Sequence, residues 1–175
     1  MSIDQRPVPF TVERGAVSVA FRRESDEEHL EPKFEIPLPP GPNLVTPHGL
    51  TLIADRTAEL ERALAHAKAA SPCDDTAIQH AERDLRYWRT RAATAQIAPT
   101  PHGETVEFGC TVRFMLNGAA REITIVGHDE ADPVADLIAA AAPIARAMMG
   151  AEVGDVLDFG GKAGAIEVLG IEVGR

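Results

Sequence analysis

The sequence contains few aromatic residues and only two cysteines, and these shortages exclude several classes of protein. Phe, Trp and Tyr together make up 5% of the 175 residues, so a hydrophobic core must be built from aliphatic side chains and alanine. Cys73 and Cys110 form no CxxC or Cys/His pattern, which argues against a zinc site and against a disulfide-rich secreted domain. Two isolated cysteines are most simply free thiols in a reducing cytoplasm.

Basic charge is also scarce, because 17 Lys and Arg residues stand against 27 Asp and Glu residues, a net charge of -10. Residues 101–175 hold 12 of the acidic and 5 of the basic residues. A negative field repels the phosphate backbone, which disfavours independent DNA binding and favours a basic protein surface as partner. No apolar segment reaches the ~18 residues of a membrane span, and the first residues lack a signal-peptide pattern. We therefore expect a cytoplasmic protein without membrane contact.

The sequence offers no convincing active site of its own. Its histidines show no HExxH or similar metal-ligand spacing, and the glycine-rich run 160–164 lacks the P-loop pattern. Asp129, Glu130 and Asp132 form an acidic cluster, which we interpret as a solvated loop, with a metal site as the alternative. We expect a protein that is not an enzyme, has no cofactor of its own and acts through a partner.

Residues 1–43 are rich in proline and acidic residues and show little periodicity. Val17, Val19 and Phe21 alternate with other residues, which predicts one short strand. Five prolines follow between residues 32 and 42, and such a stretch can donate few backbone hydrogen bonds. We interpret residues 1–43 as an extended or disordered arm. An arm that lies along a partner or folds back on the protein is the alternative.

Residues 44–98 predict an antiparallel helical hairpin of the coiled-coil type. Thr46-Pro47 and Ser71-Pro72 each place a capping residue before a proline, which is typical of helix starts, and Pro99 and Pro101 stop the second helix. Apolar residues recur at alternating spacings of three and four, the heptad pattern of a coiled coil. The stripes are Leu50, Ile53, Thr57, Leu60, Leu64 and Ala67, and Ile78, Ala81, Leu85, Trp88, Ala92 and Ala95.

The outer faces of the predicted hairpin carry basic residues. We interpret them as solvated charges that pair with neighbouring acidic residues on the helix surface. Contact with RNA or with an acidic channel wall is the alternative. These residues are Arg56, Arg62, Lys68, Arg83, Arg86, Arg89 and Arg91.

Residues 101–175 predict a small β-rich domain with one helix. Asn117-Gly118 is the turn of a predicted β-hairpin. Pro143 to Met149 predicts one short helix, which ends at Gly150. Four or five strands with one helix give an α+β fold. The predicted strands cover residues 106–116, 122–127, 156–159 and 165–173.

Several short segments, taken in their order and spacing, resemble the C-terminal domain of the bacterial transcript-cleavage factors GreA and GreB. They are Ile125-Val126-Gly127, Asp129-Glu130, Asp132-Pro133, Pro143 to Gly150 and Val153-Gly154-Asp155. Leu44 to Leu50 is similar to the start of that family's hairpin, and Val106 to Val112 to its first C-terminal strand. The resemblance covers residues 44–173. It implies an α+β protein with an N-terminal arm, a coiled-coil hairpin and an FKBP-like C-terminal domain.

The resemblance also implies a partner. In that family the C-terminal domain docks at the rim of the secondary channel of bacterial RNA polymerase, and the hairpin points into the channel. Asp74 and Asp75 at the hairpin tip would help to hold Mg²⁺ in the polymerase active site, and helix capping is the alternative role for both. In or beside the docking surface would lie Pro143, Ile144, Arg146, Met148 and Met149, with one of the two methionines packed inward.

Three features depart from the cleavage factors. The hairpin is shorter, the tip lacks the Gly-Asp followed by Glu-Asn pattern, and Ala139 to Ala142 stands where the family places polar residues. These features favour a non-catalytic regulator that occupies the channel rim and contacts RNA only indirectly. Whether it stimulates transcript cleavage is left undecided by the sequence. The alternative, from a different class, is an FKBP-like protein-binding module whose hairpin dimerises and whose partner is not RNA polymerase.

Overall fold

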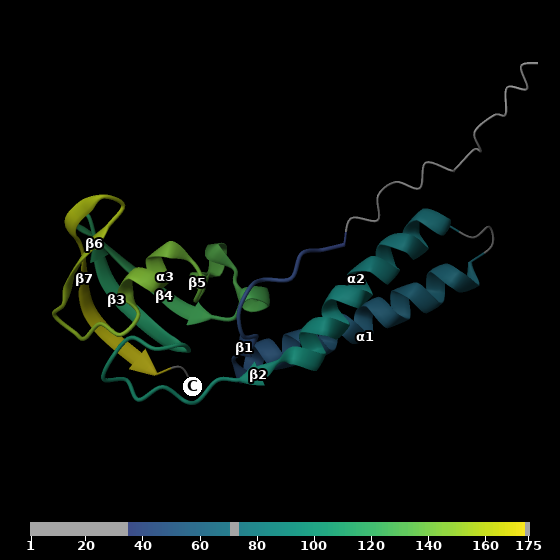
Figure 1. Ribbon diagram of the computed structural model, residues 1–175, viewed down its shortest axis with the longest axis horizontal. Coiled ribbons are helices and arrows are strands. Elements are labelled where there is room, and N and C mark those ends of the chain that lie inside the picture. The colour runs from purple at the N-terminus through teal and green to yellow at the C-terminus, as the bar shows by residue number, and fades with distance from the viewer. Residues whose placement is uncertain (1–34, 71–73, 174–175) are drawn as a thin grey trace, which may run out of the picture. The chain divides into compact units, whose positions relative to one another are not determined.

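The computed structural model describes residues 35–70 and 74–173 (Figure 1). The strand predicted around Val17 to Phe21, the predicted cap Ser71 and Cys73 lie outside the described residues. All elements below belong to the unit formed by residues 34–175. Residues 35–43 contain no helix or strand, and the predicted extent of the arm stays a prediction.

Helix α1 (Pro47–Ala69) begins where the sequence predicts it. The Thr46 hydroxyl accepts a hydrogen bond from the backbone N–H of Gly49 at 2.9 Å, which makes Thr46 the N-cap. Pro47 occupies the first turn, where a backbone N–H would have no partner within the helix. Local chemistry alone therefore fixes the start of this helix.

Helix α2 (Asp75–Thr94) differs from the prediction at both ends. Its N-cap is Asp74 rather than Ser71, because the Asp74 carboxylate accepts the N–H of Ala77 at 3.0 Å. The helix ends at Thr94, before the prolines that were predicted to stop it. The chain turns there into the short strand β2 (Gln96–Ile97), which pairs in parallel with β1 (Leu44–Val45).

The two helices pack antiparallel along the predicted apolar stripes (Figure 1). Ile53, Leu60 and Leu85 are buried, and the other stripe residues are half-buried except Ala92, which is exposed. Arg91 is buried in place of Ala92, so the prediction that Arg91 is an outer-face charge is wrong. None of the helices in the described ranges has the length and apolar composition of a membrane span.

The C-terminal domain contains a five-stranded sheet in the order β5-β4-β3-β7-β6. Asn117 and Gly118 have φ angles of 51° and 85°, the backbone of the predicted hairpin turn. The parallel edge strand β5 was not predicted, because three residues give no periodic signal. The strands are β3 (Cys110–Leu116), β4 (Ala119–Val126), β5 (Leu137–Ala139), β6 (Val156–Phe159) and β7 (Lys162–Val173).

Strand β3 begins four residues later than predicted, because Val106 pairs with the loop that follows helix α3 (Pro143–Met148). The N–H of Val106 donates to the Ala151 carbonyl, and the N–H of Gly150 donates to the Val106 carbonyl, each at 2.8 Å. Gly150 has a φ of 81°, a conformation that glycine adopts without a steric penalty. The predicted stop at Gly150 is therefore confirmed, and the helix itself ends at Met148, one residue before the predicted Met149.

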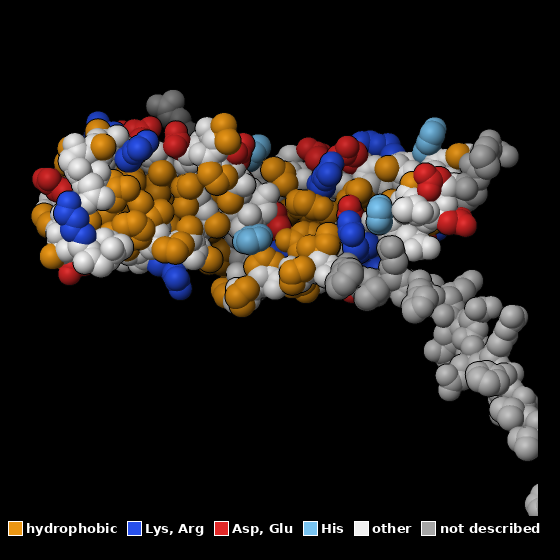
Figure 2. Space-filling view, turned by 90° about the horizontal axis from the view of Figure 1, so that it is seen from above, with side chains coloured by type: hydrophobic (Ala, Val, Ile, Leu, Met, Phe, Trp, Pro, Cys, Tyr) orange, Lys and Arg blue, Asp and Glu red, His pale blue; other side chains and the backbone are white. Residues whose placement is uncertain are grey.

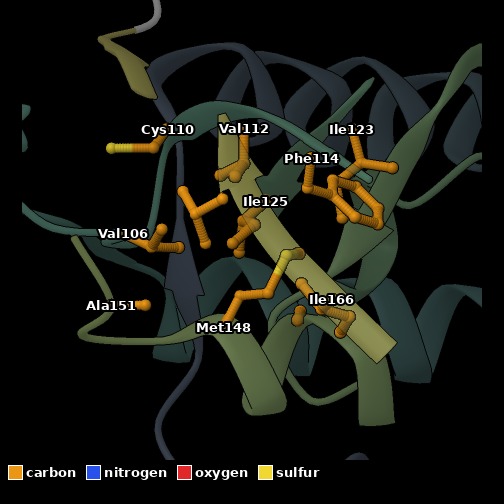
Figure 3. Packing of buried hydrophobic residues seen from close by; sticks show 11 residues of the cluster. Val106, Cys110, Val112, Phe114, Ile123, Ile125, Met148, Ala151 and Ile166 are labelled. Carbon is orange, nitrogen blue, oxygen red and sulfur yellow. The ribbon is translucent and has the colours of Figure 1, made fainter. Parts of the chain in front are cut away.

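One face of the sheet packs with α3 to form the main core (Figure 3). Met148 from α3 lies between Ile125 of β4 and Ile166 of β7, and Phe114 of β3 lies beside them. Phe114 is the only aromatic residue among the buried residues of this cluster. The aliphatic core and the α+β fold class are thus confirmed, with a helical hairpin followed by a β-rich domain.

Candidate functional site

Four of the five predicted docking residues lie on or beside the surface of α3. Pro143 and Arg146 are exposed, Met149 is 42% exposed and Ile144 is half-buried. Met148 is fully buried, so it is the methionine of the pair that packs inward, and it offers no surface to a partner. Adjacent residues project from different sides of the chain here, which places one methionine in the core and the next at the surface.

Half-buried apolar side chains from β3, β5, β6 and α3 pack against the edge of the core. They remain partly accessible because a helix of six residues cannot cover a five-stranded sheet. Figure 2 shows hydrophobic side chains gathered over the C-terminal domain, with charged side chains mainly at the margins. An apolar area of this kind can bury the hydrophobic surface of a partner protein. The half-buried residues include Leu116, Ile138, Ala140, Ala142, Ile144, Ala147, Leu157 and Phe159.

Asp74 and Asp75, the predicted tip residues, are both exposed. Oδ1 of Asp74 accepts the N–H of Ala77, so Asp74 caps α2 as the alternative interpretation expected. Capping uses one of several acceptor positions on a carboxylate, and the others stay open. Within residues 35–70 and 74–173, no group of three or more His, Cys, Asp or Glu side chains could hold a metal ion.

The structure does not bring the α3 surface and the tip together. Helix α2 has 20 residues, which is about 30 Å at ~1.5 Å per residue. Its end at Thr94, rather than its start at Asp75, leads into the C-terminal domain (Figure 1). The two candidate sites are therefore separate, and the base of the hairpin connects them.

Asp129 joins the base of the hairpin to the C-terminal domain. It lies in a short 3-10 helix, η1 (His128–Glu130), and its side chain is 5% exposed. Oδ1 accepts the hydroxyl of Tyr87 and Oδ2 accepts Nε–H of Arg91, each at 2.5 Å. The Arg91 side chain is 6% exposed. This is a buried ion pair in which each charge compensates the other.

Glu130 makes a second attachment, to the start of α1. Its two carboxylate oxygens accept the Thr46 hydroxyl at 2.8 and 2.6 Å, and the same hydroxyl oxygen accepts the N–H of Gly49. The partial positive charge at a helix N-terminus also favours a carboxylate there. We call the set of Thr46, Tyr87, Arg91, Asp129 and Glu130 the junction.

The solvated-loop interpretation is therefore wrong for Asp129 and Glu130, since both side chains are buried against the hairpin. Asp132 is exposed, and its side chain accepts the N–H of Val134 at the start of η2 (Pro133–Ala135). The three acidic residues face different partners, so they do not converge on a metal site.

Tyr87, the only tyrosine in the chain, is a titratable reporter of the junction. Burial raises the pKa of Tyr87 from 10.0 to about 12, and the hydrogen bond to Asp129 and the charge of that carboxylate act in the same direction. All three causes disfavour the phenolate, which would be poorly hydrated and would lie beside another anion.

We expect the junction to lose stability as the pH rises from about 10 through about 12. Below pH 10 Tyr87 is protonated in the folded and unfolded states, so its contribution is fully present. Above pH 10 the unfolded chain releases the proton first, which favours unfolding. The urea midpoint of the wild type should therefore approach that of Tyr87→Phe across this window. A tyrosinate absorbance titration with its midpoint near 10 would contradict this expectation.

Cys110 is a free thiol in the core of the C-terminal domain, as the sequence predicts. Its side chain is fully buried, and burial raises the pKa of the Cys110 thiol. A protonated, inaccessible thiol is a poor nucleophile. Cys110 is therefore a packing residue of the core.

Residues 100–173 match the family described as transcription elongation factor, GreA/GreB, C-terminal. The transcription elongation factor GreA of Maricaulis maris (strain MCS10) is 30% identical over 126 residues, which are 64% of this chain and 80% of that protein. The GreA of Haemophilus influenzae is 31% identical over 131 residues, 67% of this chain and 83% of that protein. The chain belongs to the GreA/GreB family.

The GreA/GreB C-terminal match includes the five-stranded sheet, α3 and η1. The α3 surface and the acidic side of the junction are therefore both parts of the family domain. Among solved structures, the crystal structure of GreA factor homolog 1 (Gfh1) of Thermus thermophilus is 21% identical. It covers 75% of this chain and 99% of its own, with a TM-score of 0.34.

The junction of this GreA/GreB-family structure could not be predicted from the sequence. Thr46 and Glu130 are 84 positions apart, and an acidic pair after a strand has the composition of a loop. The one sequence signal for a buried ion pair is Arg91, which lies beside the stripe residue Ala92 near the end of the second helix. That signal is weak, because six other basic residues on the hairpin match an acidic partner equally well.

Proposed function

We propose that this GreA/GreB-family chain regulates transcription by binding bacterial RNA polymerase at the rim of the secondary channel. The observation that carries the proposal is its membership of a family of transcription elongation factors. The C-terminal domain would dock on the polymerase, and the hairpin would point into the channel. The chain would act without catalysis of its own and would meet RNA only indirectly.

The accessible apolar side chains of α3 support a docking role. Pro143 and Arg146 are exposed, Met149 is 42% exposed and Ile144 is half-buried. Ala139 to Ala142 adds only methyl groups, so the contact would rest on apolar burial rather than on polar groups. Methionine adapts its shape to a partner surface. We therefore assign the central docking contact to Met149.

Asp74 and Asp75 would approach the Mg²⁺ of the polymerase active site. Both carboxylates are exposed, and Mg²⁺ prefers carboxylate oxygen ligands. The bound metal would supply activation of water for cutting backtracked RNA. Helix α1 has 23 residues, about 35 Å at ~1.5 Å per residue, and this length limits how far the two carboxylates reach. Occupation of the channel without cleavage is therefore the outcome we favour.

We expect Met149→Ala to weaken the binding of the full chain to core RNA polymerase by about tenfold, because truncating a central interface residue costs more than ~1 kcal/mol. The matched control is Leu169→Ala, which removes a side chain that is 43% exposed on β7. The control should retain wild-type affinity in the same titration. Equal losses in both variants would contradict docking at α3, and the absence of any binding by the wild type would overturn the proposed function.

Transcript cleavage in backtracked elongation complexes tests the tip. The informative variant is Asp74→Asn/Asp75→Asn, because asparagine caps a helix as well as aspartate but lacks the carboxylate. Cleavage by the wild type that disappears in this variant would assign both acids to the metal. Binding without cleavage in either protein would identify a channel-rim regulator whose acids serve the helix.

A binding module with a dimerising hairpin is not favoured. Ile53, Leu60 and Leu85 are already buried within a single copy of the chain, so the stripes are satisfied by the packing of α1 on α2. Membership of the GreA/GreB family also points away from an unrelated partner. The mass of the chain in solution, measured by light scattering, distinguishes a monomer from a dimer.

A further inference from the structure

We infer that Asp129 and Glu130 are positioning residues that fix the direction of the hairpin relative to the docking surface on α3. The direction itself is a property of the free protein. Its consequence for polymerase binding rests on the function proposed above. Neither residue would contact the polymerase, because both side chains are buried against the hairpin.

The two carboxylates hold different helices. Asp129 holds the C-terminal part of α2 through Tyr87 and Arg91, whereas Glu130 holds the start of α1 through Thr46. Hydrogen bonds depend on direction, while apolar contacts do not. Because α1 and α2 also pack on each other, two adjacent residues that hold both helices oppose rotation of the hairpin about either contact.

Two glycines show how closely the base of the hairpin fits. A Cβ atom on Gly49 would lie 2.6 Å from Oε2 of Glu130, and a Cβ atom on Gly127 would lie 2.8 Å from the carbonyl oxygen of Leu44. Gly49 belongs to the first turn of α1, and Gly127 immediately precedes η1. A side chain at Gly127 would meet the backbone of Leu44 and push it away, whereas one at Gly49 would displace the Glu130 carboxylate from Thr46.

A short hydrogen-bonded path leads from the junction to α3. The N–H of Asp132 donates to the Leu137 carbonyl at 2.9 Å, and the N–H of Ala140 donates to the Val126 carbonyl at 3.0 Å. The first bond holds the turn that follows η1 to β5, and the second holds the end of β5 to the end of β4. Strand β5 continues after three residues into α3 at Pro143. Asp129 and Glu130 thus connect to the docking surface through one continuous hydrogen-bonded segment of the chain.

Docking of a partner on α3 would therefore also set the direction in which the hairpin points. A partner that binds α3 and accepts the hairpin in one direction selects only correctly directed molecules. Its apparent Kd rises as the fraction of molecules in that direction falls. Loosening the junction would therefore weaken binding without altering any residue at the docking surface.

Distance measurement between two spin labels in the free, full-length protein tests the inference. The labels would be attached at Ala63→Cys on α1 and Lys162→Cys at the start of β7, both exposed positions, in a Cys73→Ser background. The buried Cys110 stays unlabelled. We expect a single narrow distance distribution for the wild type. In Thr46→Val/Asp129→Asn we expect roughly twofold broadening or a second maximum, because competing directions become populated.

Two control variants separate direction from stability. Asp74→Ala removes the cap of α2 without touching the junction, and Asp136→Asn removes one exposed acidic charge from the C-terminal domain. Both should keep the narrow distribution. The single variant Thr46→Ser keeps the hydroxyl that Glu130 accepts and should also keep the narrow distribution. A wild-type distribution in Thr46→Val/Asp129→Asn, with native circular dichroism, would overturn the inference.

Core polymerase binding by the same variants completes the test. If only about one tenth of the molecules hold the hairpin in the direction that polymerase accepts, the apparent Kd rises about tenfold. The single variant Thr46→Ser should bind with wild-type affinity. If the wild type does not bind polymerase but its distance distribution broadens in the junction variant, the proposed function fails and the positioning role stands. If the wild type binds polymerase and the distance distribution stays narrow in the junction variant, the proposed function stands and the positioning role fails.

Discussion

Replacing Asp129 with alanine is expected to lower the free energy of unfolding by about 3–5 kcal/mol, the cost of breaking a buried ion pair from one side. Arg91 would keep a guanidinium that is 6% exposed and would lose the carboxylate 2.5 Å from its Nε. The Tyr87 hydroxyl would lose the same partner. Urea unfolding followed by the fluorescence of Trp88, the only tryptophan, measures this change on the hairpin side of the junction.

Two further variants make this experiment decisive. Asp55→Ala removes an exposed acidic side chain from α1 and should change stability by less than ~0.5 kcal/mol. Arg91→Met/Asp129→Leu replaces both charges with apolar groups and should recover most of the loss, because a buried pair and an apolar pair are often similar in stability. If Asp129→Ala behaves like Asp55→Ala, the ion pair does not form in solution.

Met148→Ala is expected to destabilise the protein by about 2–5 kcal/mol, the usual range for truncating a fully buried methionine. The side chain lies between Ile125 and Ile166 (Figure 3), so its removal leaves a cavity in the middle of the core. Thermal or urea unfolding followed by far-ultraviolet circular dichroism measures the loss. Polymerase affinity of the folded fraction should stay unchanged, because Met148 offers no surface to a partner.

The neighbouring Met149 provides the matched control. Its side chain is 42% exposed, so Met149→Ala should change the free energy of unfolding by less than ~0.5 kcal/mol while it weakens polymerase binding. The two adjacent methionines thus separate packing from docking. A large stability loss in Met149→Ala, or an affinity loss in Met148→Ala at equal folded fraction, would show that this assignment of roles is wrong.

Local signals predicted most of the elements. The start of α1 follows from Thr46-Pro47, the turn between β3 and β4 from Asn117-Gly118, and the end of α3 from Gly150, because each depends on the chemistry of a few neighbouring residues. The heptad stripes identified the inner face of the hairpin. One member of the second stripe failed, since Ala92 is exposed and Arg91 is buried instead where the helix approaches the C-terminal domain.

The candidate sites were predicted less completely. The resemblance implied that the short helix predicted over residues 143–149 is a docking element, but it could not say which of Met148 and Met149 faces the core. That choice depends on how α3 lies on the sheet. The end of α2 was also misplaced, because Thr94 is followed by pairing of β2 with β1, a contact between segments about fifty residues apart in the chain.

By itself the sequence determined the helical hairpin, the β-rich domain, the aliphatic core and, through its resemblance, the GreA/GreB family. These features depend on periodicity, caps, turns and composition, which a linear chain displays. Only the tertiary structure decided that the carboxylates of Asp129 and Glu130 are buried. A carboxylate can be buried only where partners compensate it, and those partners, Arg91 and Thr46, come from 38 and 84 positions away.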